Sequence, residues 1–108
     1  MKILLDENID VRFKTSFPES IEVYTVQDMG WKGVKNGDLI QLLSQHEFDF
    51  FVVVDKNIPY QQNTKKLPCK VIVLDVIRNT LQHLIPLVPQ VLSASKKDDD
   101  QNIIIIKA

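Results

Sequence analysis

Four aspartates stand at positions where a carboxylate could do chemistry. Three short apolar runs each end directly in an aspartate, at Asp6, Asp55 and Asp75. A fourth, Asp38, begins a helical pattern over residues 38–46. In an open α/β sheet, ligands bind at the carboxyl ends of the strands, near the point where the strand order reverses. We therefore expect these aspartates at one edge of a sheet, with the strands before Asp6 and Asp75 as neighbours at its centre.

Carboxylates that converge on one place repel one another unless a cation neutralises them. Mg²⁺ and Mn²⁺ prefer oxygen ligands, typically one or two carboxylates together with waters and substrate phosphates. Such a metal generates hydroxide near neutral pH and stabilises the charge on a phosphodiester during hydrolysis. Without metal, repulsion among Asp6, Asp38 and Asp55 should raise the pKa of at least one of them. The alternative for any single aspartate is a helix cap or a turn, which is the commoner role.

A glycine-rich segment, residues 30–37, holds a second group of candidates. It contains Trp31 followed by Lys32 and Lys35, and an exposed tryptophan near lysines can stack on a single-stranded base. The alternative, packing of Trp31 over the end of the sheet, is the favoured interpretation. His46 and His83 lack carboxylate or cysteine companions at ligand spacing, so we interpret both as structural.

The elements that must position these residues follow from the apolar pattern. Five short apolar runs predict strands at residues 3–5, 21–26, 50–54, 71–74 and 103–106. The second run alternates and indicates an edge strand, whereas unbroken runs place 3–5, 50–54 and 71–74 at the centre. Helices are predicted between the strands at residues 8–17, 38–46, 59–66 and 80–95, the last one split near Pro86. This alternation predicts an α/β fold: a three-layer α/β/α sandwich with a mainly parallel sheet of about five strands.

Composition sets the broad class of protein. The 108 residues are 44% hydrophobic, enough for one core and therefore one domain over residues 1–108. Thirteen basic and fourteen acidic side chains leave a net charge of −1, which excludes the basic field of a nucleic-acid coat protein but allows a local basic patch. A single cysteine, Cys69, indicates a reducing compartment. Apolar runs are too short for a signal peptide or a bilayer span, so we expect a cytoplasmic protein without membrane contact.

The acidic positions also carry a resemblance. The relevant stretches are Leu4-Leu5-Asp6-Glu7-Asn8, Asp38-Leu39-Ile40, Val53-Val54-Asp55-Lys56-Asn57 and Tyr60-Gln61-Gln62-Asn63. Their order and spacing, over nearly the whole chain, resemble the PIN-like branch of the PIN-domain superfamily, small proteins related to VapC-type toxin nucleases. The resemblance implies the three-layer fold and a ribonuclease that uses Mg²⁺ or Mn²⁺ to cleave single-stranded RNA.

The resemblance also assigns roles to residues. Asp6, Asp38 and Asp55 would bind the metal and act in catalysis, with Asn57 as a further oxygen ligand. Glu7 and Asp75 would be neighbours of the site. Substrate contacts are expected from seven residues: Asn8, Trp31, Lys56, Gln61, Gln62, Asn63 and Lys65. RNA is the expected partner, and an antitoxin protein and a second copy of the chain are further candidate partners.

Two departures from the family pattern leave an alternative open. Many members carry a second aspartate where this chain has Asn57, and the middle position is often glutamate rather than the shorter Asp38. Asn57 offers an oxygen but no charge to a metal. A PIN-like module that has lost catalysis and only binds a partner therefore stays open as the second interpretation.

A phosphoreceiver domain is the third interpretation. The pair Asp6-Glu7 and the later Asp55 fit the acidic positions of a receiver. However, only 15 residues separate Asp55 from the run at 71–74, too few for the turn and full helix of a receiver. That run also ends in Asp75, where a receiver has a hydroxyl residue, so the receiver ranks below the two PIN-like interpretations.

Overall fold

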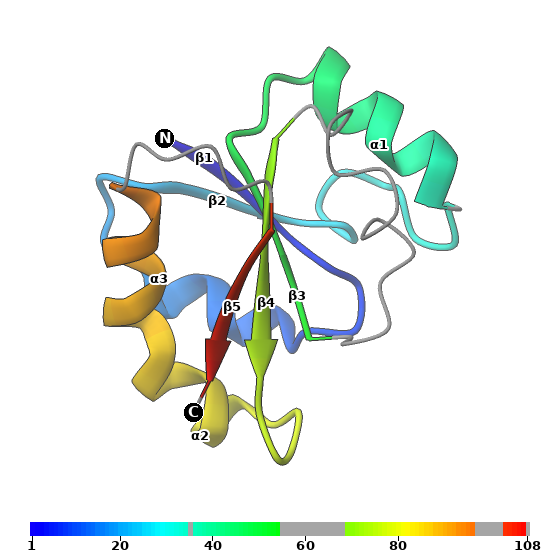
Figure 1. Cartoon of the computed structure of the whole chain (residues 1–108). Coiled ribbons are helices and arrows are strands. Elements are labelled where there is room, and N and C mark those ends of the chain that lie inside the picture. The colour runs from blue at the N-terminus through cyan, green and yellow to red at the C-terminus, as the bar shows by residue number, and fades with distance from the viewer. Residues whose placement is uncertain (35, 55–68, 97–102, 108) are drawn as a thin grey trace.

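The molecule is built on a five-stranded, entirely parallel sheet with the strand order β2-β1-β3-β4-β5 (Figure 1). The computed structural model describes residues 1–34, 36–54, 69–96 and 103–107. Its strands are β1 (Lys2–Leu5), β2 (Glu22–Thr25), β3 (Phe50–Val53), β4 (Lys70–Asp75) and β5 (Ile103–Lys107). The expected α/β class and parallel sheet are thus confirmed.

Burial explains the order of the strands. All four residues of β3 are buried, and β3 lies in the middle, paired with β1 on one side and β4 on the other. The alternating run forms β2 at an edge, as predicted. One expectation was wrong: the strands before Asp6 and Asp75 are not neighbours, because the fully apolar β3 separates them. Unbroken apolar runs indicate central strands but not which central strands pair.

The first helical segment is shorter than expected. Instead of a helix over residues 8–17, the chain forms a 3₁₀ helix, η1 (Val11–Ser16). Asp10 caps it by accepting a hydrogen bond from the Arg12 backbone amide at 2.9 Å. Phe17 is already extended, as expected for a residue that precedes a proline.

The remaining helices agree better with the sequence pattern. The helix expected at residues 38–46 is α1 (Asn36–Gln45). The segment expected at 80–95 is split, as predicted, into α2 (Leu81–Leu84), η3 (Ile85–Leu87) and α3 (Val88–Ser95). The prolines at 86 and 89 lack the amide hydrogen that a continuous helix needs. The helix expected at 59–66 lies outside the described residues.

Helical segments pack against both faces of the sheet (Figure 1). Side chains alternate along each strand, so Leu5 joins one core cluster and Leu4 the other. The Leu5 cluster includes residues of η1, α2 and α3, and the Leu4 cluster includes residues of α1. Within the described ranges, no helix is long and apolar enough to cross a membrane. Loops, rather than these helices, surround the carboxyl ends of the strands.

Candidate functional site

Asp6 lies where the strand order reverses. The chain runs from β1 outward to β2 and then returns to β3 on the other side of β1. The backbone amide of Asp6 donates to the Val52 carbonyl of β3 at 3.0 Å, so Asp6 extends the ladder between β1 and β3. The reversal point between two such strands is where ligands bind in doubly wound α/β proteins. The fold therefore brings Asp6 to the most favourable position for a ligand.

The carboxylate of Asp6 is half-buried and its ionised form is disfavoured. Burial raises the pKa of Asp6, and the charge of Glu7 raises it further. Hydrogen bonds from the Glu7 and Asn8 backbone amides and from Asn8 Nδ2, 3.4 Å from Asp6 Oδ2, act in the opposite direction but are outweighed. A raised pKa was expected from repulsion with Asp38 and Asp55. The direction agrees, but the main cause is burial and the neighbouring charge is that of Glu7.

Glu7 holds the loop that follows β2. Its Oε2 accepts a hydrogen bond from the Gly33 backbone amide at 3.3 Å, and its carbonyl accepts one from Gln27 Nε2 at 3.1 Å. Gly33 has a φ of +82°, which L residues with a side chain rarely adopt. The glycine therefore lets the loop present its amide to Glu7.

The start of the same loop is fixed by Thr25 and Asp28. Asp28 Oδ2 accepts from the Thr25 amide at 3.0 Å, and Thr25 Oγ1 accepts from the Asp28 amide at 2.9 Å. Lys14 Nζ, from η1, donates to Asp28 Oδ2 at 2.9 Å and is the main cause that lowers the pKa of Asp28. Sequence reasoning missed this turn, although the Thr-x-x-Asp spacing is the signature of reciprocal side-chain and backbone bonds.

The loop after β4 reaches the same place. Asn79 Nδ2 donates to the Asn8 carbonyl at 2.7 Å. Loops that follow β1, β2 and β4 are therefore joined through hydrogen bonds to the short segment 6–8. The site is a turn at the end of β1, held in place by its two neighbouring loops.

Among the described residues, Asp38 and Asp75 do not complete a three-ligand metal group with Asp6. Asp75 ends β4, which is two strands away from β1. By the strand register it lies about 10 Å from Asp6 across the sheet and two residues, about 7 Å, further along the strand direction. Asp38 is exposed in the first turn of α1. Of the residues that the structure describes, no three histidine, cysteine or acidic side chains form a group able to hold a metal ion. Asp55 and Asn57 lie outside those residues.

Of the seven predicted substrate contacts, the structure describes two, Asn8 and Trp31. Asn8 lies in the turn itself. Trp31 is half-buried, with its ring centroid 5.0 Å from that of His46 and 6.0 Å from that of Phe48, which supports the favoured packing interpretation. Base stacking on Trp31 stays a prediction. The remaining five lie outside the described residues: Lys56, Gln61, Gln62, Asn63 and Lys65.

Two arginines that the sequence did not single out line a hollow next to this turn. The hollow has a volume of about 510 Å³ and is lined by Arg12, Arg78, Thr80, Leu81, Gln82, His83 and Ile85. Arg12 is engaged with Asp10, with Nη2 and Oδ2 2.6 Å apart, and Arg78 directly precedes the asparagine that contacts Asn8. The two arginines are 66 positions apart in the chain, so no local sequence signal links them.

Cys69 is not a nucleophile of this site. Burial and the charge of Asp49 raise the pKa of its thiol to about 12. A thiol with this pKa is almost fully protonated at neutral pH and therefore inert.

No protein-family model matches the chain, and neither do the curated proteins nor the solved structures with which it was compared. Fold and site alone therefore define the class: a parallel α/β protein with the flavodoxin-like strand order and an acidic turn at its reversal point.

Proposed function

We propose that this protein is a ribonuclease of the PIN-like type that uses Mg²⁺ or Mn²⁺ to hydrolyse phosphodiester bonds of single-stranded RNA. The observation that carries the proposal is the position of Asp6, a half-buried carboxylate at the reversal point between β1 and β3. Charge that is costly to bury and lies at a ligand-binding edge is characteristic of functional sites. The resemblance of the acidic stretches to PIN-like nucleases supplies the chemistry.

Asp6 could give a hard divalent cation one carboxylate ligand. Such an ion commonly takes only one or two protein carboxylates and completes its shell with water and phosphate oxygens. Asp6 would be the first ligand, and Asp38, Asp55 and Asn57 are the further ligands that the resemblance implies. The metal would supply an activated water and stabilise charge on the phosphodiester.

The chain's own groups would orient the site and the substrate. Asn8 hydrogen-bonds the Asp6 carboxylate and limits its rotation. Glu7 holds the neighbouring loop through Gly33. Arg78 lines the adjacent hollow, where a guanidinium can bind a phosphate of the RNA backbone. As the toxin of a toxin–antitoxin pair in the cytoplasm, the protein would need a partner that covers this edge.

Calorimetric titration with Mn²⁺ tests the metal site directly. Wild type should bind Mn²⁺, and Asp6→Asn should weaken binding by at least about tenfold, because it removes the charge at the reversal point. Asp49→Asn, the same change before β3 at the opposite edge of the sheet, is the matched control and should bind as wild type does. Equal binding by wild type and Asp6→Asn would remove Asp6 from the site.

The observed strand order also fits the phosphoreceiver interpretation, because doubly wound receiver sheets have the same order. The strand order therefore does not choose between the two functions. Incubation with acetyl phosphate, followed by mass measurement, separates them: a receiver would gain one phosphoryl group on an aspartate, whereas the proposed nuclease would gain none and would cleave RNA with Mn²⁺. Metal-dependent RNA binding without cleavage would favour the binding-only module.

A further inference from the structure

Among the described strands, β5 lies at one edge of the sheet. It pairs with β4 through Val71↔Ile103 to Asp75↔Lys107, and no other described strand pairs with it. Every second residue of such an edge presents its backbone amide and carbonyl outward. These groups can bind a further strand.

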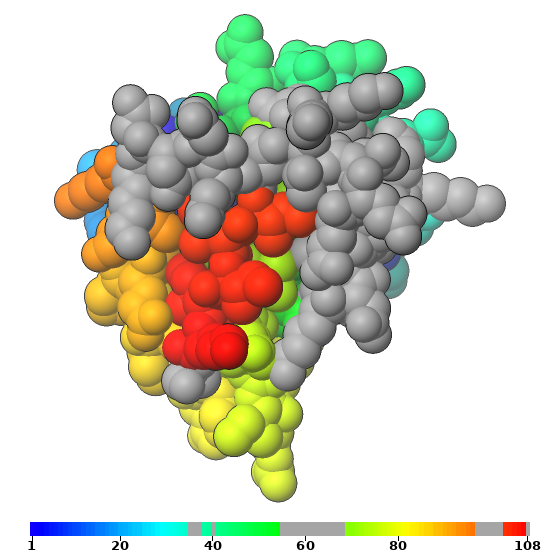
Figure 2. All heavy atoms as spheres, viewed as in Figure 1, coloured from blue at the N-terminus to red at the C-terminus, as the bar shows by residue number. Residues whose placement is uncertain are grey.

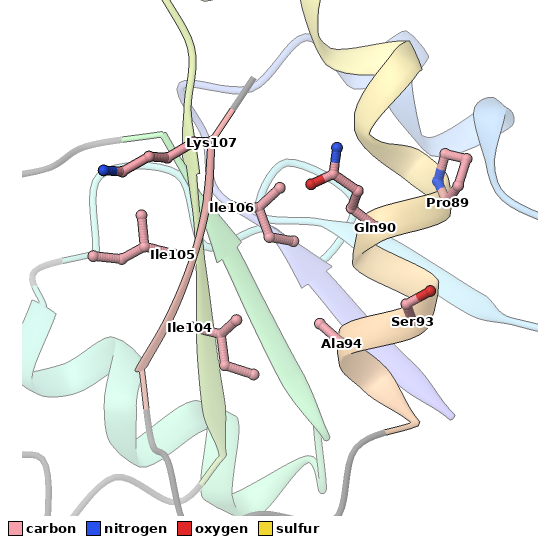
Figure 3. Close-up of a pocket in the computed structure, with 8 residues that line it drawn as sticks. All are labelled: Pro89, Gln90, Ser93, Ala94, Ile104, Ile105, Ile106 and Lys107. Carbon is pink, nitrogen blue, oxygen red and sulfur yellow. The ribbon is translucent and has the colours of Figure 1, made fainter.

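The side chains of β5 are unusually apolar for an open edge. Ile105 is 55% exposed, whereas Ile106 is only 5% exposed. Figure 3 shows Ile104 and Ile106 directed toward α3, and Ile105 directed away from it together with Lys107. A groove of about 380 Å³ lies between α3 and β5, and the strand reaches the molecular surface beside it (Figure 2). Apolar surface is thus available on both faces of the strand.

The opposite edge of the sheet is built differently. The edge strand β2 has four residues and begins with the exposed Glu22. A short edge strand with a charged residue discourages pairing with another chain. Residues 103–106 of β5 are four consecutive isoleucines with neither charge nor proline. Only one of the two edges therefore has the features of a pairing surface.

We propose that β5 pairs antiparallel with β5 of a second copy of this chain, around a two-fold axis. Such an axis runs perpendicular to the sheet, so each side chain stays on the same face of the sheet. One residue of the strand then lies directly opposite the same residue of the partner, and the axis passes between these two copies. With Ile105 at the axis, Ile105 faces its own copy and Ile104 faces Ile106 of the partner. This register covers the most exposed isoleucine of the strand with an identical side chain.

The strand suits a copy of itself because the pairing is self-complementary. In this register Lys107 lies opposite Ile103 of the partner, so the two lysines are at opposite ends and do not repel each other. Isoleucine pairs across antiparallel strands are favourable. The two sheets would form one continuous sheet with their carboxyl edges on opposite sides. Each copy would keep a complete candidate site, so this inference does not depend on the proposed nuclease function.

Cysteine cross-linking tests the register. In Ile105→Cys the two Cα atoms would lie about 4.5–5.5 Å apart, within the range of a disulfide. Oxidised glutathione should therefore link this variant into covalent dimers. In the control Ile103→Cys, the two Cα atoms would be about 14 Å apart, and no link should form. Wild type, whose Cys69 is buried, controls for the native thiol. Linking at 103 but not at 105 would overturn the register.

Sedimentation velocity tests the dimer itself. Wild type should sediment as a dimer, and Ile105→Lys as a monomer, because two lysines would face each other at the axis. Ile77→Lys is the matched control: Ile77 is 93% exposed in the loop after β4, and its replacement should leave the dimer intact. A monomeric wild type, a dimer unaffected by Ile105→Lys, or assemblies larger than a dimer would each overturn the proposal.

Discussion

The half-buried carboxylate of Asp6 lowers the stability of the folded protein when it is ionised. Its folded pKa is raised, so the neutral form is the one that the fold favours. The stability associated with the neutral carboxyl group is fully present below the unfolded pKa, near 3.8. It is lost as the pH rises through the folded pKa. At neutral pH the ionised carboxylate therefore costs folding free energy. Functional sites often keep charged groups that lower stability.

The first prediction is that Asp6→Asn stabilises the metal-free protein at pH 7. The amide keeps a hydrogen-bond acceptor for the turn and removes the half-buried charge, so the melting temperature should rise by a few degrees. Thermal unfolding followed by circular dichroism with EDTA is the measurement. At pH 3 the difference should shrink, because Asp6 is then largely neutral. A lower melting temperature at pH 7 would contradict the assigned cost.

Replacing Asn57 tests the proposed nuclease against the binding-only module. It lies outside the described residues, and the prediction rests on the sequence and the proposed function. We expect slow, Mn²⁺-favoured cleavage of single-stranded RNA, abolished by Asp55→Asn and increased by Asn57→Asp, which restores charge without changing size. Cleavage of a labelled oligonucleotide is the measurement. If neither wild type nor Asn57→Asp cleaves RNA, the binding-only interpretation replaces the nuclease.

At the scale of elements, η1 depends on one local ion pair. The Asp10 carboxylate accepts from the Arg12 amide at 2.9 Å and from its guanidinium at 2.6 Å. Hydrogen bonds to the Arg12 side chain and amide lower the pKa of Asp10 to about 2. This contribution to stability is present above the unfolded pKa, near 3.8, and is lost as the pH falls through about 2.

Replacing this cap should therefore have a pH-dependent effect. Asp10→Ala should lower the melting temperature by a few degrees at pH 6 and by less at pH 2, where the wild-type carboxylate is half protonated. Asp10→Asn, which keeps the cap but loses the charge, should fall between wild type and Asp10→Ala at pH 6. A destabilisation independent of pH would assign the effect to side-chain packing instead.

At the scale of the whole molecule, the reactivity of the buried Cys69 thiol can be used to measure unfolding. It belongs to the core cluster of Leu4 and Phe51, and its pKa is raised to about 12. We predict that a disulfide reagent such as dithionitrobenzoate reacts with native protein at least about a hundredfold more slowly than with protein in denaturant. Added urea should accelerate the reaction in step with unfolding. Rapid reaction of the native protein would place the thiol at an accessible surface.

The local pattern of the chain determined most elements of the fold. Unbroken apolar runs predicted the central strands, and the alternating run predicted the edge strand β2. Prolines predicted the split between α2 and α3. These predictions succeed because burial on both faces, pleat alternation and the missing proline amide act within a few residues. The sequence pattern did not predict the short extent of η1, which lies between the Asp10 cap and Pro18.

The order of the strands and the surroundings of Asp6 depended on tertiary structure. Sequence reasoning located Asp6 at the end of a strand but paired that strand with β4, because equally apolar runs do not encode which neighbours they choose. The hydrogen bond from Asn79 to Asn8 and the hollow lined by both Arg12 and Arg78 join segments that are far apart in the chain. Such long-range contacts are decided by the packing of the whole sheet, which no local pattern records.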